Sequence, residues 1–118
     1  MAQLAMAAME PAIDRGHLAR MTFGDRSLQQ EVLQLFDRQS ALLIARMRTG
    51  NGDAISAMAH TLKGSAAGIG AQSVVRAAAA AEQAAAHAPG DLSASIDELA
   101  QAVDEARALI AELLHKGA

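Results

Sequence analysis

Residues 60–70 read His60-Thr61-Leu62-Lys63-Gly64-Ser65-Ala66-Ala67-Gly68-Ile69-Gly70, and they lie within an apolar pattern of helical period. The apolar positions have the spacing of one buried stripe on a helix, and they are Ile55, Met58, Ala59, Leu62, Ala66 and Ile69. At roughly 100° per residue, His60 points about 150° away from the middle of this stripe. We therefore expect its imidazole to face outward, away from the core.

The residues around His60 on this predicted outer face are small. Ala57 precedes it by three positions, Gly64 follows it by four, and Ala67 lies one turn further on. A glycine inside a helix costs about 1 kcal/mol relative to alanine, and here one stands beside the histidine. Small neighbours leave the ring accessible to another protein. Lys63 adds a cation within reach of any anionic group carried on the ring.

The whole chain predicts an all-α fold, in which four substantial helices follow one short helix and are joined by short turns. The predicted helices are Pro11–Met21, Ser27–Arg48 with a cap at Asp25 or Ser27, a helix capped by Asp53 and ended by Gly70, one from Ala71 or Gln72 to Ala86, and a last one capped by Asp91 or Ser93. Short connections make neighbouring helices antiparallel, so we predict an up-down-up-down four-helix bundle with a short extra N-terminal helix. We treat residues 1–118 as one domain whose residues 1–9 are loosely ordered.

Apolar periodicity also predicts which faces the other helices bury. The first long helix keeps the 3.6-residue period at Leu28, Val32, Leu35, Phe36, Leu42, Leu43 and Met47. The last helix alternates spacings of four and three, typical of an a/d seam, at Leu92, Ile96, Leu99, Val103, Ala106, Ile110 and Leu113. Between them, the run Ala77–Ala81 permits close contact between helix backbones. We interpret Gly68 and Gly70 as residues for close packing and helix termination.

Composition restricts the class of protein. The chain has 118 residues, a formal net charge of −3 and no cysteine, so disulfides and thiolate metal sites are absent and a nucleic-acid-binding role is disfavoured. No apolar run is long enough to span a bilayer, and the first residues lack the basic region of a signal peptide. We expect a cytoplasmic protein that binds neither nucleic acid nor membrane.

The stretch from His60 to Gly70 resembles the signature of histidine-containing phosphotransfer domains, the HPt modules of two-component phosphorelays. That signature has a histidine, any residue, an aliphatic residue, lysine, glycine, small residues, and then an aliphatic residue and glycine. This sequence supplies the pattern in register with His60, Leu62, Lys63, Gly64, Ser65, Ala66, Ile69 and Gly70. The resemblance implies a four-helix bundle. It also implies phosphorylation of His60, with Lys63 and Gly64 as accompanying site residues.

The resemblance further implies a carrier rather than a kinase. Its partners would be response-regulator receiver domains and a hybrid sensor histidine kinase, and the aspartate and Mg²⁺ for the reaction would come from the receiver. Because no phosphate-cradling loop is present, we expect no cofactor on this chain and no ATP-dependent activity. Docking would use a flat patch of Ala57, Gly64 and Ala67, with a rim of unassigned residues from the helix Ser27–Arg48.

Other residues have less distinctive settings. Glu82 lies where members of the family often carry a glutamate, and we interpret it as structural. Gln72 and Arg76 have positions that leave their relation to His60 open. We interpret His17, His87 and His115 as surface residues, because their spacings suit no metal site.

Two alternatives remain open. One is a phosphotransfer domain taken from a longer kinase, and the other is a helical-bundle adaptor or dimerisation module in which His60 plays no part. The seam from Leu92 to Leu113 could then pair between two chains.

Overall fold

The computed structural model describes residues 11–116, and every regular element in this range is helical. In chain order the elements are α2 (Arg15–Met21), α3 (Arg26–Met47), α4 (Gly52–Ile69), α5 (Gln72–His87), the 3₁₀ turn η1 (Pro89–Asp91) and α6 (Leu92–Lys116). The prediction of an all-α chain is confirmed. The expectation of loose order for residues 1–9 lies outside the described residues.

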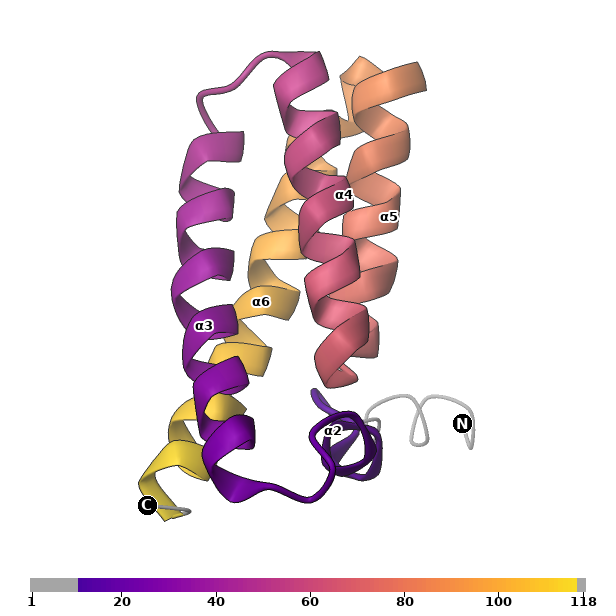
Figure 1. Cartoon of the computed structure of the whole chain (residues 1–118). Coiled ribbons are helices and arrows are strands. Elements are labelled where there is room, and N and C mark those ends of the chain that lie inside the picture. The colour runs from indigo at the N-terminus through magenta and orange to yellow at the C-terminus, as the bar shows by residue number, and fades with distance from the viewer. Residues whose placement is uncertain (1–10, 117–118) are drawn as a thin grey trace, which may run out of the picture.

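The four long helices form a closed ring of neighbours. Helix α3 packs against α4, α4 against α5, α5 against α6, and α6 against α3. In Figure 1 these four helices stand side by side along one axis, and the short α2 lies across one end, where it contacts α4. The arrangement is a four-helix bundle with a crossing helix at the end where α4 finishes.

Small side chains form much of the core between α4 and α5. On α5 the buried residues are Val74, Ala78, Ala81 and Ala84, and on α4 both Ala59 and Ala66 are fully buried. Alanine adds little width, so two helix backbones that meet through alanines approach closely. The contact between α4 and α5 is accordingly the most extensive of the helix contacts described, as the alanine run predicted.

The buried face of α3 differs from its predicted stripe. Its buried residues are Leu33, Phe36, Ser40 and Met47, whereas Leu35 and Leu42 are 57% and 50% exposed. Helix α3 has leucines on more than one side, so apolar spacing alone does not identify the side that meets α4 and α6. The buried Ser40 hydroxyl donates to the Asp37 carbonyl at 3.3 Å, so its polar group has a partner in the core.

The helix starts also refine the predicted bounds. Helix α2 begins at Arg15 rather than Pro11, because the Asp14 side chain accepts from the backbone N–H of His17 at 3.0 Å and acts as the cap. The cap of α4 is Asn51, whose side chain accepts from the Ala54 N–H at 2.9 Å. The predicted cap Asp53 lies inside the first turn, where its charge still favours the helix dipole.

The N-cap predicted for α3 is confirmed, whereas those predicted for α6 are corrected. Asp25 caps α3 as predicted, since its side chain accepts from the Leu28 N–H at 3.0 Å. Asp91 belongs to the 3₁₀ turn that precedes α6, and Ser93 lies inside α6, which begins at Leu92.

Helix α4 ends at a glycine that also joins it to the start of α2. Gly70 has φ of 78°, in the left-handed region, and its carbonyl accepts from the backbone N–H of Asp14 at 2.9 Å. A Cβ on Gly70 would lie 2.9 Å from the Asp14 carbonyl oxygen. Both the backbone angle and the close approach of α2 therefore require glycine here, as predicted for termination and packing.

Replacing Gly70 by alanine is expected to destabilise the bundle by about 2 kcal/mol or more, because left-handed backbone costs an alanine about 1–2 kcal/mol and the added Cβ meets backbone. The matched control is Gly64→Ala, whose Cβ meets nothing within 4 Å and which should stabilise the helix by about 1 kcal/mol. Urea unfolding of both variants tests the pair. Equal free energies of unfolding for the two variants would contradict the conclusion that position 70 requires glycine.

Among residues 11–116, no helix is both long enough and apolar enough to cross a bilayer.

Candidate functional site

His60 lies on the outward face of α4, one position after Ala59 and two positions before Leu62, both of which are fully buried. Ala59 and Leu62 point into the core with no exposed surface, whereas the His60 side chain is 69% exposed. The outward orientation predicted from the apolar stripe is therefore confirmed.

Glu82 of α5 connects His60 and Lys63 through its two carboxylate oxygens. Oε2 lies 3.0 Å from His60 Nδ1 and Oε1 accepts from Lys63 Nζ at 2.8 Å. Sequence reasoning interpreted Glu82 as structural and did not place it at the histidine. No local pattern could have done so, because the two residues are 22 positions apart and meet only through the packing of α4 on α5.

The charge on Glu82 determines which nitrogen of His60 carries the proton. The hydrogen bond from Lys63 lowers the pKa of Glu82 most, the partial burial of the carboxylate opposes this, and the His60 hydrogen bond lowers it further. An ionised carboxylate can only accept, so His60 Nδ1 carries the hydrogen. In the neutral ring, the lone pair is then on Nε2, the nitrogen that does not contact Glu82.

The space beside the ring is open, as the small residues predicted. Gly64 is exposed, and a Cβ built there would meet nothing within 4 Å. Ala57 and Ala67 are both exposed on the same helix. The structure therefore brings together Ala57, His60, Gly64 and Ala67 on one accessible face, with Lys63 turned toward Glu82.

Helix α2 supports the C-terminal end of this face. His17 Nε2 lies 3.0 Å from the Ala67 carbonyl oxygen, and a carbonyl can only accept, so this ring nitrogen is the donor. The Ala67 carbonyl is in the last turn of α4 and also accepts from the Gly70 N–H at 3.3 Å, so His17 adds a second hydrogen bond at this helix end. His17 was interpreted as a surface residue; its side chain is partly exposed, and in addition it connects α2 to α4.

An apolar groove runs beside α4 toward α2 and α3. It has a volume of about 280 Å³ and is lined by Met21, Thr22, Val32, Leu35, Phe36, Gln39, Ser65, Gly68 and Ile69. The large apolar side chains that are exposed in the described range, Met21, Phe23, Leu35 and Leu42, all belong to α2, α3 or the turn between them. A Cβ built on Gly68 would meet nothing within 4 Å, so close packing does not require glycine here, contrary to our interpretation.

Within the described part of the chain, no group of three or more His, Asp or Glu residues is arranged to hold a metal ion. Arg76, whose relation to His60 the sequence left open, donates to the Ser73 hydroxyl at 3.4 Å one turn earlier on α5.

A family model described as the Hpt domain matches residues 26–115, which include α3, α4, α5 and all but the last residue of α6. No curated protein and no solved structure matches the chain.

Proposed function

The chain belongs to the Hpt domain family, whose members carry phosphoryl groups on a histidine in phosphorelays, and we propose that His60 is the phosphorylated residue here. The observation that supports this most directly is the geometry of the ring. Glu82 accepts from Nδ1, which leaves Nε2 as the nucleophile on an exposed side chain.

The proposed step moves a phosphoryl group from a receiver aspartate to His60. The Nε2 lone pair attacks phosphorus, a P–N bond forms, the P–O bond to the aspartate breaks, and the aspartate leaves as a carboxylate. The ring then carries a positive charge, which the adjacent Glu82 carboxylate stabilises. Transfer to a second receiver reverses the same bond changes. We propose that the Mg²⁺ for both transfers is held by the receiver.

Lys63 has two roles in this proposal. Its ammonium holds the Glu82 carboxylate at 2.8 Å, and it supplies positive charge one turn from the ring. A transferred phosphoryl group brings two negative charges close to Glu82, and a nearby ammonium reduces the repulsion between them. Lys63 therefore positions Glu82 in the resting protein and stabilises the phosphorylated one.

Hpt domains are carriers that generally have no kinase activity of their own, and they interact with receiver domains and with kinases. We propose that this chain is a carrier without ATP-dependent activity, with a receiver domain or a hybrid sensor kinase as donor. The proposed setting is an up-down-up-down bundle with α2 as its extra N-terminal helix, working in the cytoplasm.

The proposed docking surface has Ala57, Gly64 and Ala67 at its centre. Its rim, which the sequence left unassigned, is the exposed apolar edge of α3 at Leu35 and Leu42. The groove beside α4 lies between that edge and Gly68. An exposed apolar surface of this kind beside the histidine suits contact with another protein.

The test of the proposal is to incubate the protein with a phosphorylated receiver domain. Phosphate on a histidine nitrogen is labile in acid and stable in alkali, so the two treatments distinguish it from a phosphoester. The adaptor alternative predicts no such phosphate.

Adding bulk beside the ring should slow transfer without unfolding the bundle. Gly64→Leu fills open space, and we expect transfer to slow by roughly 100-fold, the effect of displacing reacting groups by about 1 Å. Ala67→Trp should act in the same direction. Rapid-quench measurement of phosphate transfer gives the rate. The control Ala108→Leu adds a similar bulk on the exposed face of α6, and a comparable loss there would contradict the docking surface.

A further inference from the structure

A second cleft lies at the end of the bundle where α2 crosses. It has a volume of about 730 Å³, and its lining residues come from α2, the first two turns of α3 and the last two turns of α6. Helices α4 and α5, which carry His60, Lys63, Gly64 and Glu82, contribute no lining residue. A ligand in the cleft would therefore not contact His60, Lys63, Gly64 or Glu82.

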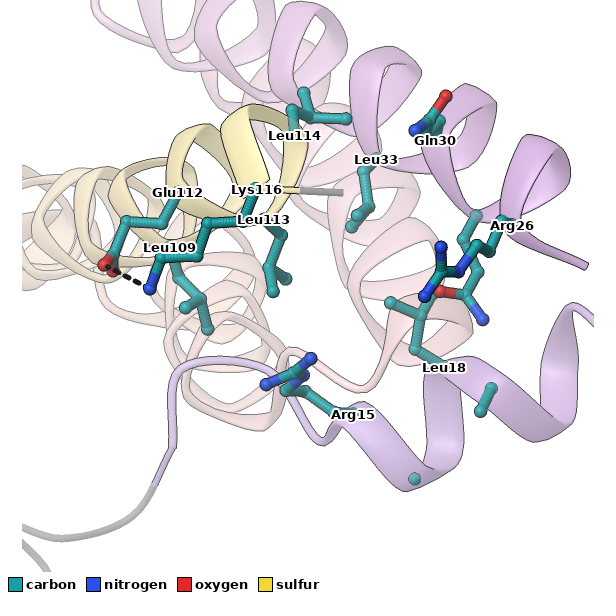
Figure 2. A pocket seen from close by; sticks show the side chains of 13 residues that line it. Arg15, Leu18, Arg26, Gln30, Leu33, Leu109, Glu112, Leu113, Leu114 and Lys116 are labelled. Atoms are coloured by element: carbon teal, nitrogen blue, oxygen red, sulfur yellow. Dashed lines mark ion pairs between the residues drawn. The ribbon is translucent and has the colours of Figure 1, made fainter. Parts of the chain in front are cut away.

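The floor of the cleft is leucine. Leu18 and Leu33 are buried beneath it, and Leu109, Leu113 and Leu114 at the end of α6 are only partly buried. Figure 2 shows the α6 leucines on one side of the cleft and Leu18 and Leu33 on the other. An apolar side chain that entered between them would remove leucine surface from water, which is favourable at about 25 cal/mol per Å².

The rim of the cleft is positively charged, in a chain whose formal net charge is −3. Arg15, Arg26 and Lys116 line it, with Glu112 as the one carboxylate among its lining residues. The Glu112 Oε1 atom lies 3.9 Å from Lys116 Nζ and both side chains are exposed, so this ion pair contributes little binding energy. Neither arginine makes an ion pair within residues 11–116.

The positions of these cations favour an extended acidic ligand over a single anionic headgroup. In Figure 2 the charged ends of Arg15, Arg26 and Lys116 lie on separate sides of the cleft and do not converge on one point. One phosphate or carboxylate could contact only one of them well. Several carboxylates spread along a segment with an apolar face could contact all three.

We propose that this cleft binds an amphipathic, acidic helix of a partner protein, with its apolar face on the leucines and its Asp and Glu side chains at the rim. Helices that lay an apolar face into a groove are a common mode of protein recognition. A partner held here stays attached while His60 exchanges phosphoryl groups, so its own reactive domain meets His60 at a raised effective concentration. The binding itself does not depend on the function of His60.

The probe is a synthetic helical peptide of about 18 residues, or five turns, with leucines on one face and glutamates beside them. We expect it to bind the full chain and to shift amide NMR signals of α2, the start of α3 and the end of α6. Arg15→Glu with Arg26→Glu should weaken binding at least tenfold, since each reversal replaces an attraction by a repulsion. Both positions begin helices, where a glutamate is favourable, so the fold is kept.

The matched control is Arg38→Glu with Arg46→Glu, which makes the same charge change on α3 outside the cleft. It should leave peptide affinity within about twofold, apart from the general effect of net charge, which added salt reduces. His60→Gln should bind the peptide like the unmodified chain, so failure of the phosphotransfer proposal and failure of this one are distinguishable.

Three results would overturn the proposal: no binding of the acidic peptide, equal binding of a peptide with lysines in place of its glutamates, or an affinity that the Arg15 and Arg26 reversals leave unchanged. Binding of phosphatidylglycerol vesicles that depends on these two arginines, without peptide binding, would assign the cleft to a lipid surface instead.

Discussion

His60→Gln is expected to abolish phosphoryl uptake while leaving the bundle folded. Glutamine has no nucleophilic nitrogen, because its amide lone pair is delocalised into the carbonyl. The change is on an exposed side chain whose described hydrogen bond goes to Glu82, so the free energy of unfolding should change by no more than about 0.5 kcal/mol. Labelling by a phosphorylated receiver domain, with thermal unfolding alongside, measures both effects.

The control for this variant is His115→Gln, a histidine at the exposed end of α6. It should be labelled like the unmodified chain. Full labelling of the His60→Gln variant would move the phosphorylated residue elsewhere, whereas loss of its helical structure would show that the ring has a structural role.

Removing Glu82 should slow transfer by roughly 10- to 100-fold, the usual cost of losing the group that orients a functional imidazole. Glu82→Ala releases both Nδ1 of His60 and the Lys63 ammonium. Glu82→Gln keeps an oxygen that can accept from the ring but loses the charge, so we expect an intermediate rate. The control is Glu98→Ala, an exposed acid on α6 whose loss should leave the rate unchanged.

A spectroscopic measurement separates orientation of the ring from general stability. In the unmodified chain, ¹⁵N NMR of His60 should show the hydrogen on Nδ1 in the neutral ring, and Glu82→Ala should shift it toward the usual mixture with Nε2–H. An unchanged tautomer in Glu82→Ala would contradict the role given to this carboxylate.

The contact between the ionised Glu82 carboxylate and His60 Nδ1 depends on pH through the lowered pKa of Glu82. The hydrogen bond from Lys63 is its largest cause, and a depressed carboxyl pKa means that the contact is present above the ordinary pKa of the group. The contact is lost only as the pH falls through the lower, folded-state value. The rate difference between Glu82→Gln and the unmodified chain should therefore persist across the neutral range.

Local periodicity was enough to predict much of the site. One turn of helix separates His60 from Gly64 and from Ala57, so the helical period alone placed these residues on one accessible face. The same period buried Leu62 and Ala66, and the structure agrees. The position of Gly70 at the end of α4 followed from glycine's preference for left-handed backbone.

Contacts between helices were beyond local periodicity. Glu82 of α5 contacts His60 of α4, and His17 of α2 contacts Ala67 of α4, because separate helices pack together. The buried side of α3 was assigned partly wrongly for the same reason, since exposed Leu35 and buried Leu33 are equally apolar. In each case the deciding quantity is how one helix is rotated and placed against another.

The alanines between α4 and α5 fix the distance between the two helices, and that distance determines where the Glu82 carboxylate lies relative to His60. Ala59 and Ala66 on one helix and Ala78 and Ala81 on the other have no side-chain freedom to absorb a change in separation. The packing of the two helix backbones thus positions His60 beside Glu82 before a partner protein binds. Ala78→Leu, which adds three carbons at a fully buried position one turn before Glu82, is expected to push α4 and α5 apart and to weaken the contact between Glu82 and His60 without touching the ring.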